Sequence, residues 1–373
     1  MTTREVTPLT QVFVSISDPR SARQVRHDLS ELLTVAVCVV LCCADEFSDI
    51  EAWAKERIEW LRGFLVLEHG VPSHDTFGRV FAALDPREFE GAFRRWVGQL
   101  VPTLGTDAVV AIDGKTSRRS TTKADANPLH MVSAFAADIG LVLGQTATAE
   151  KSNEITAIPE MLATLALEGW LTIDAMGAQT SIARQIRKGG ADYVLCVKDN
   201  HPKLVESFLL AQAGVGGKLT PNSTSETTDD GHGQYEVRRC WAFDAVDRLY
   251  RAEQWPDLKS SAIVERERTV GSKTSCERRY YISSLPADAK RIAHAVRSHW
   301  EVENRLHWCL DVQFNEDQST VRTGFAANNL AIVRHIVINL LRLNKSRKSS
   351  IKTKRMLAAT SDQFRAELLG VTT

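Results

Sequence analysis

Two aspartates in the sequence directly follow apolar segments that are typical of buried strands. Asp113 closes A-V-V-A-I-D-G-K, and Asp174 closes G-W-L-T-I-D-A-M-G. A small residue follows each aspartate, so the backbone can turn there and the carboxylate can project beyond the strand end. A single strand-end aspartate more often caps a helix or forms a turn. Together, however, the two predict a site at one sheet edge if their strands are neighbours.

A third carboxylate, Glu303, lies in R-S-H-W-E-V-E-N-R-L-H-W-C-L-D, a segment with helical periodicity. On an ideal helix Glu303 shares a face with Trp300, His307 and Leu310, so a carboxylate stands on a side that is otherwise aromatic and apolar. His299 and His307 are each four residues away, and a buried hydrogen-bonded pair with either one explains the pattern equally well. Two roles are therefore open for Glu303: a ligand, or half of a pair within the helix.

Three acids that meet without a counter-charge repel one another and raise one another's pKa values, so such a cluster needs a cation to stay ionised near neutral pH. Carboxylate oxygens suit Mg²⁺ or Mn²⁺. Two such ions, roughly 3.5 to 4 Å apart, would activate the attacking oxygen and stabilise the leaving oxygen of a phosphodiester. Asp113, Asp174 and Glu303 are therefore the candidate catalytic residues and metal ligands.

The spacing of apolar residues indicates how the chain positions these acids. Helical spacing from Asp28 to about Leu104 predicts an all-helical N-terminal domain over 1–105. The α/β part, 106–345, is predicted as a mixed five-stranded sheet with flanking helices and a β-rich insertion at about 201–286. The segment 346–373 is expected to be a basic C-terminal tail. The predicted strands are 108–112, 131–137, 141–148, 170–173 and 193–197, with helices at 155–167 and 180–188.

One helix of the N-terminal part has a defined start. The stretch V-P-S-H-D-T-F-G-R-V-F makes Ser73 the N-cap of an amphipathic helix after a turn. This layout is compatible with the second helix of a helix-turn-helix, although plain scaffold is the commoner role. The region 1–105 is accordingly a candidate DNA-binding domain.

Composition limits the classes of function. Of the 373 residues, 46 are Lys or Arg and 46 are Asp or Glu, so any nucleic-acid partner must be held by local patches. The apolar run Leu32 to Ala44 is too short to cross a bilayer, and no signal-peptide layout precedes it, which favours a cytoplasmic protein without a membrane partner. The seven cysteines include no C-x-x-C pair and are expected to be reduced packing residues.

Several motifs, in order along nearly the whole chain, resemble bacterial insertion-sequence DDE transposases, and most closely the H-repeat-associated group. They are I-D-G-K-T-S-R, K-S-N-E-I, L-T-I-D-A-M-G-A-Q, V-K-D-N-H-P-K-L and H-W-E-V-E-N-R-L-H-W-C-L-D-V-Q-F-N-E-D-Q-S, with N-terminal V-R-H-D-L-S-E-L-L-T-V-A-V-C-V-V-L and V-P-S-H-D-T-F-G-R-V-F-A-A-L-D-P. The resemblance implies an RNase H-like catalytic domain in which Asp113, Asp174 and Glu303 fall on the DDE positions. It further implies binding of double-stranded terminal inverted repeats, Mg²⁺-dependent cleavage at the ends, attack of the freed 3′ hydroxyl on target DNA, and a homodimer in the active complex.

The sequence departs from the pattern of related transposases around the glutamate. Their Tyr and Arg before it and Lys after it fall on Val296, His299 and Leu310 here. His299 is a candidate phosphate contact if it is protonated, and its charge would then depend on pH. His201 also stands where this group more often has Gln, and nothing in the sequence explains that change.

Further candidate DNA contacts lie near the predicted active edge and in the tail. Lys115, Lys151 and Asn153 follow strand ends, and Arg347 and Lys348 begin the basic tail. Solvated surface is an equally good explanation for the lysines. Two alternative functions follow from the altered motif, a catalytically inactive transposase-derived DNA-binding protein and a metal-dependent nuclease without strand transfer.

Overall fold

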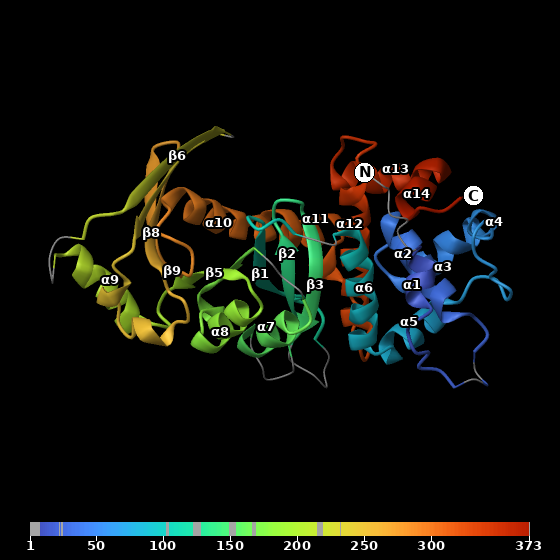
Figure 1. Ribbon diagram of the computed structural model, residues 1–373. Helices are drawn as coiled ribbons and strands as arrows, with labels where there is room; N and C mark the ends of the chain where they lie inside the picture. Colours follow the sequence, from blue (N-terminus) through green and yellow to red (C-terminus); the bar gives the residue numbers. More distant parts are fainter. Residues whose placement is uncertain are drawn as a thin grey trace.

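The computed structural model describes residues 8–21, 23, 25–101, 104–121, 128–148, 154–165, 169–214, 219–231 and 233–372. The molecule is elongated, with a helical bundle at one end, a central sheet, and a long-stranded extension at the other end (Figure 1). None of the helices in these residues combines the length and the apolar character needed to cross a membrane.

The described strands form one nine-stranded sheet in the order β3-β2-β1-β4-β5-β9-β8-β7-β6. Strands β1, β4 and β5 are parallel, and β2 and β3 continue the sheet antiparallel. This arrangement confirms the RNase H-like fold and its five predicted strands. The strands are β1 (Val109–Thr116), β2 (His130–Ala136), β3 (Leu141–Ala147), β4 (Trp170–Ile173), β5 (Asp192–Val197), β6 (Ser223–Gly231), β7 (Gln234–Phe243), β8 (Ser260–Val270) and β9 (Lys273–Ser283).

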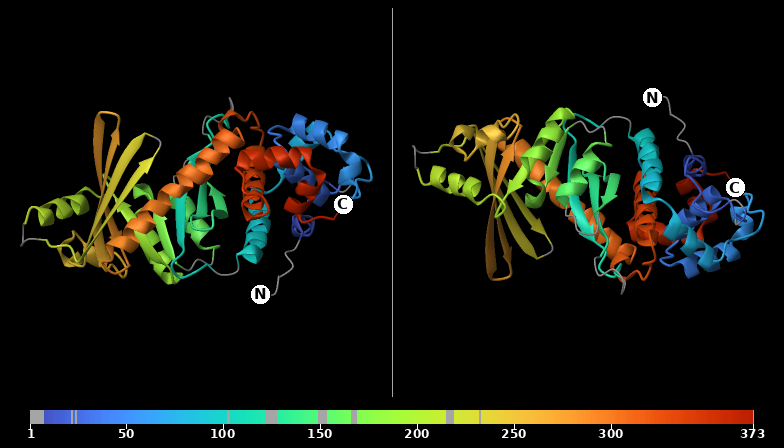
Figure 2. Two further views of the ribbon diagram at one scale, coloured as in Figure 1. Left: turned by 90° about the horizontal axis from the view of Figure 1, so that it is seen from above. Right: turned by 90° about the horizontal axis from the view of Figure 1, so that it is seen from below.

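The insertion continues the catalytic sheet instead of forming a sheet of its own. Its last strand, β9, pairs antiparallel with β5, and β8, β7 and β6 follow in hairpin order. Figure 2 shows these long strands projecting beside helix α10 (Ala289–Glu301). The chain thus returns from the insertion onto the edge of the central sheet, and it then enters the helix that leads to Glu303.

Both faces of the central sheet are covered, which explains the continuous apolar runs of β1, β4 and β5. Val109 packs with Ile292 of α10 on one face, whereas Val110 belongs to the core that contains Ile158 of α7 (Glu154–Leu162) and Ile182 of α8 (Thr180–Lys188). The strand ends are therefore held between two helical layers.

The helical end combines the N-terminal helices with a helix from the far end of the chain. Side chains of Asp28, Ser73 and Asp85 accept backbone N–H bonds at the starts of α2, α5 and α6, as expected for N-caps. Helix α12 (Ala326–Leu343) packs against all three and against β3. The N-terminal helices are α1 (Leu9–Phe13), α2 (Leu29–Leu41), α3 (Phe47–Glu56), α4 (Ile58–Leu61), α5 (His74–Ala83) and α6 (Pro86–Leu100).

The segment expected to be a basic tail contains two packed helices, α13 (Ile351–Thr360) and α14 (Asp362–Leu369). Its cations bind backbone carbonyls and aromatic rings, which local charge patterning does not reveal. The Lys354 ammonium donates to the Leu341 carbonyl at 2.7 Å, and the Arg355 Nη2 donates to the Val40 carbonyl at 2.7 Å. The Arg365 guanidinium lies 4.0 Å from the ring centre of Trp60.

The remaining short elements connect these layers. They are η2 (Ala175–Gly177), α9 (Pro202–Gln212), η3 (Val246–Arg248), η4 (Ala252–Gln254), η5 (Val302–His307), α11 (Trp308–Gln313) and η6 (Glu316–Gln318).

Candidate active site

The two aspartates lie in neighbouring positions of the sheet, but only Asp174 follows a strand end. Strand β1 continues past Asp113 to Thr116, and Gly114 pairs with Val132 of β2, so the turn expected at Gly114 was wrong. Strands β1 and β4 are parallel neighbours, and Ile112 is the register partner of Ile173, so the next residues are Asp113 and Asp174. Asp174 precedes the short turn η2, but its side chain makes no capping hydrogen bond there. The capping role that a lone aspartate usually has is therefore not observed for Asp174.

Glu303 lies in η5, a π-helical segment that joins α10 to α11. Such segments inside helices are frequent at functional sites. Val302 and Leu306 are buried while Glu303 is exposed, so the extra residue in the turn directs the carboxylate outward. Among the described residues, no hydrogen bond joins Glu303 to His299 or His307, and the paired role within the helix is not observed.

The three acids are close enough to perturb one another. The pKa of the Asp113 carboxyl is raised to about 7, chiefly by burial and also by the negative charges of Glu154, Glu303 and Asp174, while one backbone hydrogen bond from Gly114 opposes the shift. Burial also raises the pKa of Glu303; Asp174 adds to this shift, and Arg279 opposes it. Like charges thus gather at this edge without full compensation.

Glu154, a fourth acid at this edge, was not among the residues chosen from the sequence. It is the first residue of α7, and its Oε1 lies 3.0 Å from Nε2 of His130 on β2. A side chain at Gly114 would displace the ends of both side chains, so glycine lets the His130–Glu154 pair lie beside Asp113. The segment K-S-N-E-I, residues 151–155, contains Glu154 and is the sequence signal that points to it.

The donor set suits a hard divalent cation. Carboxylates are the ligands that Mg²⁺ and Mn²⁺ prefer, and the raised pKa of Asp113 is the response expected of an acid cluster that lacks a cation. Within the part of the chain that the structure describes, no three His, Cys, Asp or Glu side chains already stand at metal-ligand spacing. Metal binding by Asp113, Asp174 and Glu303 therefore stays a prediction.

Two family models match the chain. One, described as DDE_Tnp_1-associated, matches residues 10–97, and the other, the Transposase DDE domain, matches residues 104–340. The chain belongs to the DDE transposase family.

Full-length relatives carry transposase names. "Putative transposase YncI" of Escherichia coli O157:H7 is 40% identical over 361 residues, which cover 95% of this chain and 92% of that protein. "H repeat-associated putative transposase YhhI" of E. coli strain K12 is 36% identical over 372 residues, 98% of each chain. The piggyBac transposase, in its synaptic complex with hairpin DNA, aligns at a TM-score of 0.45 with 10% identity, over 99% of this chain and 79% of that one.

Related transposases have Tyr, Arg and Lys at three positions near the glutamate. In this chain Val296, His299 and Leu310 stand there, and they supply no fixed positive charge. Val296 and Leu310 are buried. Burial lowers the pKa of His299, whose Nδ1 lies 3.1 Å from the Thr172 hydroxyl, so its ring is neutral near pH 7. His307 lies 3.7 Å from Asp113, Nδ1 to Oδ2, and burial lowers its pKa to about 4 with a contribution from Lys115.

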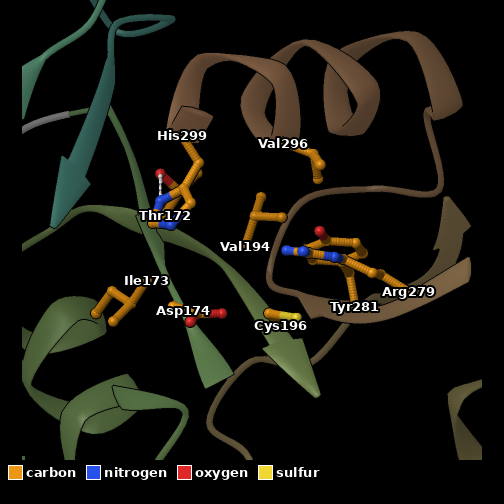
Figure 3. Close-up of a pocket in the computed structure, with 9 residues that line it drawn as sticks. All are labelled: Thr172, Ile173, Asp174, Val194, Cys196, Arg279, Tyr281, Val296 and His299. Carbon is orange, nitrogen blue, oxygen red and sulfur yellow. Dashed lines mark hydrogen bonds between the residues drawn. The ribbon is translucent and has the colours of Figure 1, made fainter. Parts of the chain in front are cut away.

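A cation does reach the acids of this transposase, but from the insertion. Arg279 on β9 lines one pocket together with Asp174, Val296 and His299 (Figure 3). Its guanidinium lies 4.4 Å from the ring centre of Trp300. No sequence signal identified Arg279, because only the pairing of β9 with β5 brings it here.

Lys115, predicted as a DNA contact, is held in an internal ion cluster. Its Nζ lies 2.7 Å from Asp311 Oδ1, 2.9 Å from Glu316 Oε2 and 3.2 Å from Asp317 Oδ1. Arg334 completes the cluster, 3.4 Å from Glu316. The ammonium is thus already neutralised, and a DNA contact by Lys115 stays a prediction.

The other predicted DNA contacts are placed only in part. Arg347 and Lys348 are exposed in the loop between α12 and α13. Lys151 and Asn153 lie outside the described residues. Their contacts with DNA, like that of His299, stay predictions.

Proposed function

We propose that this chain is an active transposase that cleaves phosphodiesters at the ends of its element and joins the freed 3′ ends to target DNA. The observation that carries the proposal is the gathering of Asp113, Asp174 and Glu303 at one sheet edge, with the pKa of Asp113 raised to about 7. A carboxyl that resists ionisation until a cation arrives is suited to bind metal and substrate together.

Asp113, Asp174 and Glu303 would hold Mg²⁺ or Mn²⁺, in two ions, which supply an activated attacking oxygen and a stabilised leaving oxygen when bound. The protein's own groups then act in defined ways. Asp113 would have to be ionised to hold a cation, and its proton would pass to solvent. His307 is a neutral neighbour, and Arg279, which is paired with Glu277, would offer a permanent positive charge beside Glu303 to a DNA phosphate.

The partners follow from this activity. Double-stranded terminal inverted repeats and target DNA are the substrates. A homodimer is the minimal assembly, because two ends must be cut together, and the cytoplasm is the place of action.

The test uses a plasmid that carries the reading frame with its native flanking DNA, incubated with the protein and Mg²⁺. Asp113→Asn should reduce cleavage by about 10²- to 10³-fold, the scale expected when one electrostatic stabiliser of a transition state is lost, while DNA binding in a gel-shift assay is retained. Asp107→Asn is the matched control, because Asp107 precedes the other end of β1 and is mostly exposed in a pair with Arg291.

The outcomes separate the alternatives. Equal cleavage by the parent and Asp113→Asn contradicts the proposal. Specific binding by the parent with no cleavage in either metal identifies an inactive DNA-binding protein. Cleavage without joining to a target plasmid identifies a nuclease.

A further inference from the structure

A groove runs between the insertion strands and helix α10 and ends at Glu303. Its volume is about 650 Å³, and its lining extends from Ser225 and Thr227 on β6 to Glu303 and Asn304 in η5. The long strands and the helix that form its two walls lie beside each other (Figure 2). Anything held in this groove is therefore directed to the carboxylate edge.

Guanidinium groups are concentrated on the groove face of the sheet. The register places Arg238 of β7 directly opposite Arg266 of β8, and like charges opposite one another destabilise a sheet. Arg297 of α10 adds a third charge: burial lowers the pKa of Arg238, and the positive charges of Arg297 and Arg266 lower it further. The strands maintain this repulsion at a cost in stability.

Nearby acids compensate these groups incompletely. Glu236 pairs with Arg238, and Glu277, opposite Arg266 in the register, is shared between Arg266 at 3.5 Å and Arg279 at 2.8 Å. A single Asp229 likewise serves Arg297 at 3.5 Å and Arg238 at 4.0 Å. Arg238 Nη1 and Arg266 Nε are buried and find no hydrogen-bond acceptor in the described residues. Buried donors without an acceptor are uncommon in native proteins and require an explanation.

The opposite face of the same strands shows the compensated arrangement. There Arg239 lies opposite Glu265, and Glu265 lies opposite Arg278. Arg239 binds Glu226 and Glu267 at 2.9 Å each, and Arg278 binds Glu265. Because alternate residues of a strand face opposite sides, the excess of positive charge belongs to the groove side alone.

Further groups on the groove side suit a nucleic-acid strand. Trp300 lines the groove and offers an aromatic ring, on which bases stack. Bases are free to stack on such a ring where they are not stacked within a duplex, which favours a single strand. Besides Arg239, which strand alternation assigns to the opposite face, the cations that line the groove are Arg238, Arg266, Arg268, Arg279, Lys290 and Arg297, and its acids are Glu236, Glu277, Glu301 and Glu303.

We propose that this arginine groove binds the phosphate backbone of a single DNA strand and leads that strand to the acids. The inference rests on the proposed function, because it extends the same site. Phosphate oxygens accept hydrogen bonds from guanidinium groups that line the groove, and their negative charge relieves the repulsion between Arg238 and Arg266. Arg279 occupies the junction between the groove and Glu303.

The test measures binding of a fluorescent single-stranded oligonucleotide by anisotropy over a range of salt, without divalent metal. Arg266→Gln should lower the slope of log affinity against log salt by about 0.7, the value for one single-strand phosphate contact. Arg278→Gln removes the same charge from the opposite face of the adjacent strand and should leave the slope unchanged. Equal slopes for the parent and Arg266→Gln, or equal losses in both variants, would overturn the inference.

Two further arms identify the ligand. An equal slope change with a blunt duplex overturns the single-strand assignment. Inorganic phosphate and the oligonucleotide are also compared at equal phosphate concentration. If both raise the melting temperature equally, the groove contains an isolated anion site, and the proposal that it binds a strand is overturned.

Folding of the variants is checked by melting temperature. If Arg266→Gln does not fold, Arg297→Gln replaces it, because that side chain is half exposed on α10, and the same slope change is expected. The binding assay and the cleavage assay separate failure of this inference from failure of the proposed function. Asp113→Asn should still bind the oligonucleotide, whatever the outcome of the cleavage assay.

Discussion

Strand β1 carries two charged residues on one face, Asp113 and Lys115, and their surroundings differ. Around Lys115 opposite charges are matched at short distances, with Asp311, Glu316 and Asp317 against one ammonium and with Arg334 behind Glu316. Around Asp113 the charges are alike and unmatched. The same strand end thus holds a cluster that stabilises the fold and one that weakens it.

The pKa directions show the difference directly. Burial opposes the charge of the Lys115 ammonium, yet its pKa is raised because Glu316 and Asp311 favour the charged form. Glu316 is fully buried, yet its pKa is lowered by Arg334 and Lys115. At Asp113, burial and neighbouring acids act in the same direction. A protein keeps such an uncompensated cluster where function requires it.

The largest effect in this comparison is expected on the matched side. Lys115→Met leaves Asp311 and Glu316 without their cation and should reduce the free energy of unfolding by about 3–5 kcal/mol, the cost of removing one partner of a buried pair. Urea denaturation measures it. Lys198→Met, at an exposed position after β5, is the control. An unchanged free energy of unfolding for Lys115→Met would mean that the cluster is not structural.

A second effect concerns pH on the unmatched side. Because the folded pKa of Asp113 is about 7 and its ordinary value is 3.8, the folded state binds the proton more tightly than the unfolded state. The contribution of Asp113 to the free energy of unfolding is therefore fully present below about pH 4. It is lost as pH rises to about 7, by on the order of 2–4 kcal/mol. Melting temperatures in EDTA should show this decline.

Magnesium and substitution should each reduce that decline. Bound Mg²⁺ favours the ionised carboxyl, and Asp113→Asn removes the titrating group. Parallel melting curves for the parent and the variant across this pH range would contradict the raised pKa.

The smallest effect is expected for His299. Its pKa is lowered by burial, so the ring carries no charge to lose near pH 7. His299→Gln, which keeps a hydrogen-bonding group for Thr172, should change the cleavage rate by less than about tenfold and leave the pH profile between 6 and 8 unaltered. A larger loss, confined to pH values below 7, would show that a protonated His299 contacts phosphate.

Much of the architecture could be predicted from the sequence, because the signals for it are local. Asp113 and Asp174 each close an apolar run before a small residue, and parallel pairing then makes them neighbours. The position of Glu303 could be predicted only approximately, since an ideal helix does not anticipate the π-helical turn that directs its carboxylate outward.

The remainder depended on contacts between distant parts of the chain. Arg279 reaches the acids only through the pairing of β9 with β5, and Glu154 only through the packing of α7 against β2 and β3. Lys354 and Arg355 resembled a solvated tail because their partners are backbone carbonyls elsewhere in the chain. Charge patterning along the sequence carries no information about such partners.

The position of α12 to α14 also determines when the helical end can fold. Chains are synthesised from the N-terminus at about 5–20 residues per second, yet the bundle around α2 is filled by α12 and its Val40 carbonyl is bound by Arg355. The first helices to leave the ribosome must therefore wait, incompletely packed, for the last ones. A chain truncated before Arg355 would leave its N-terminal helices incompletely packed.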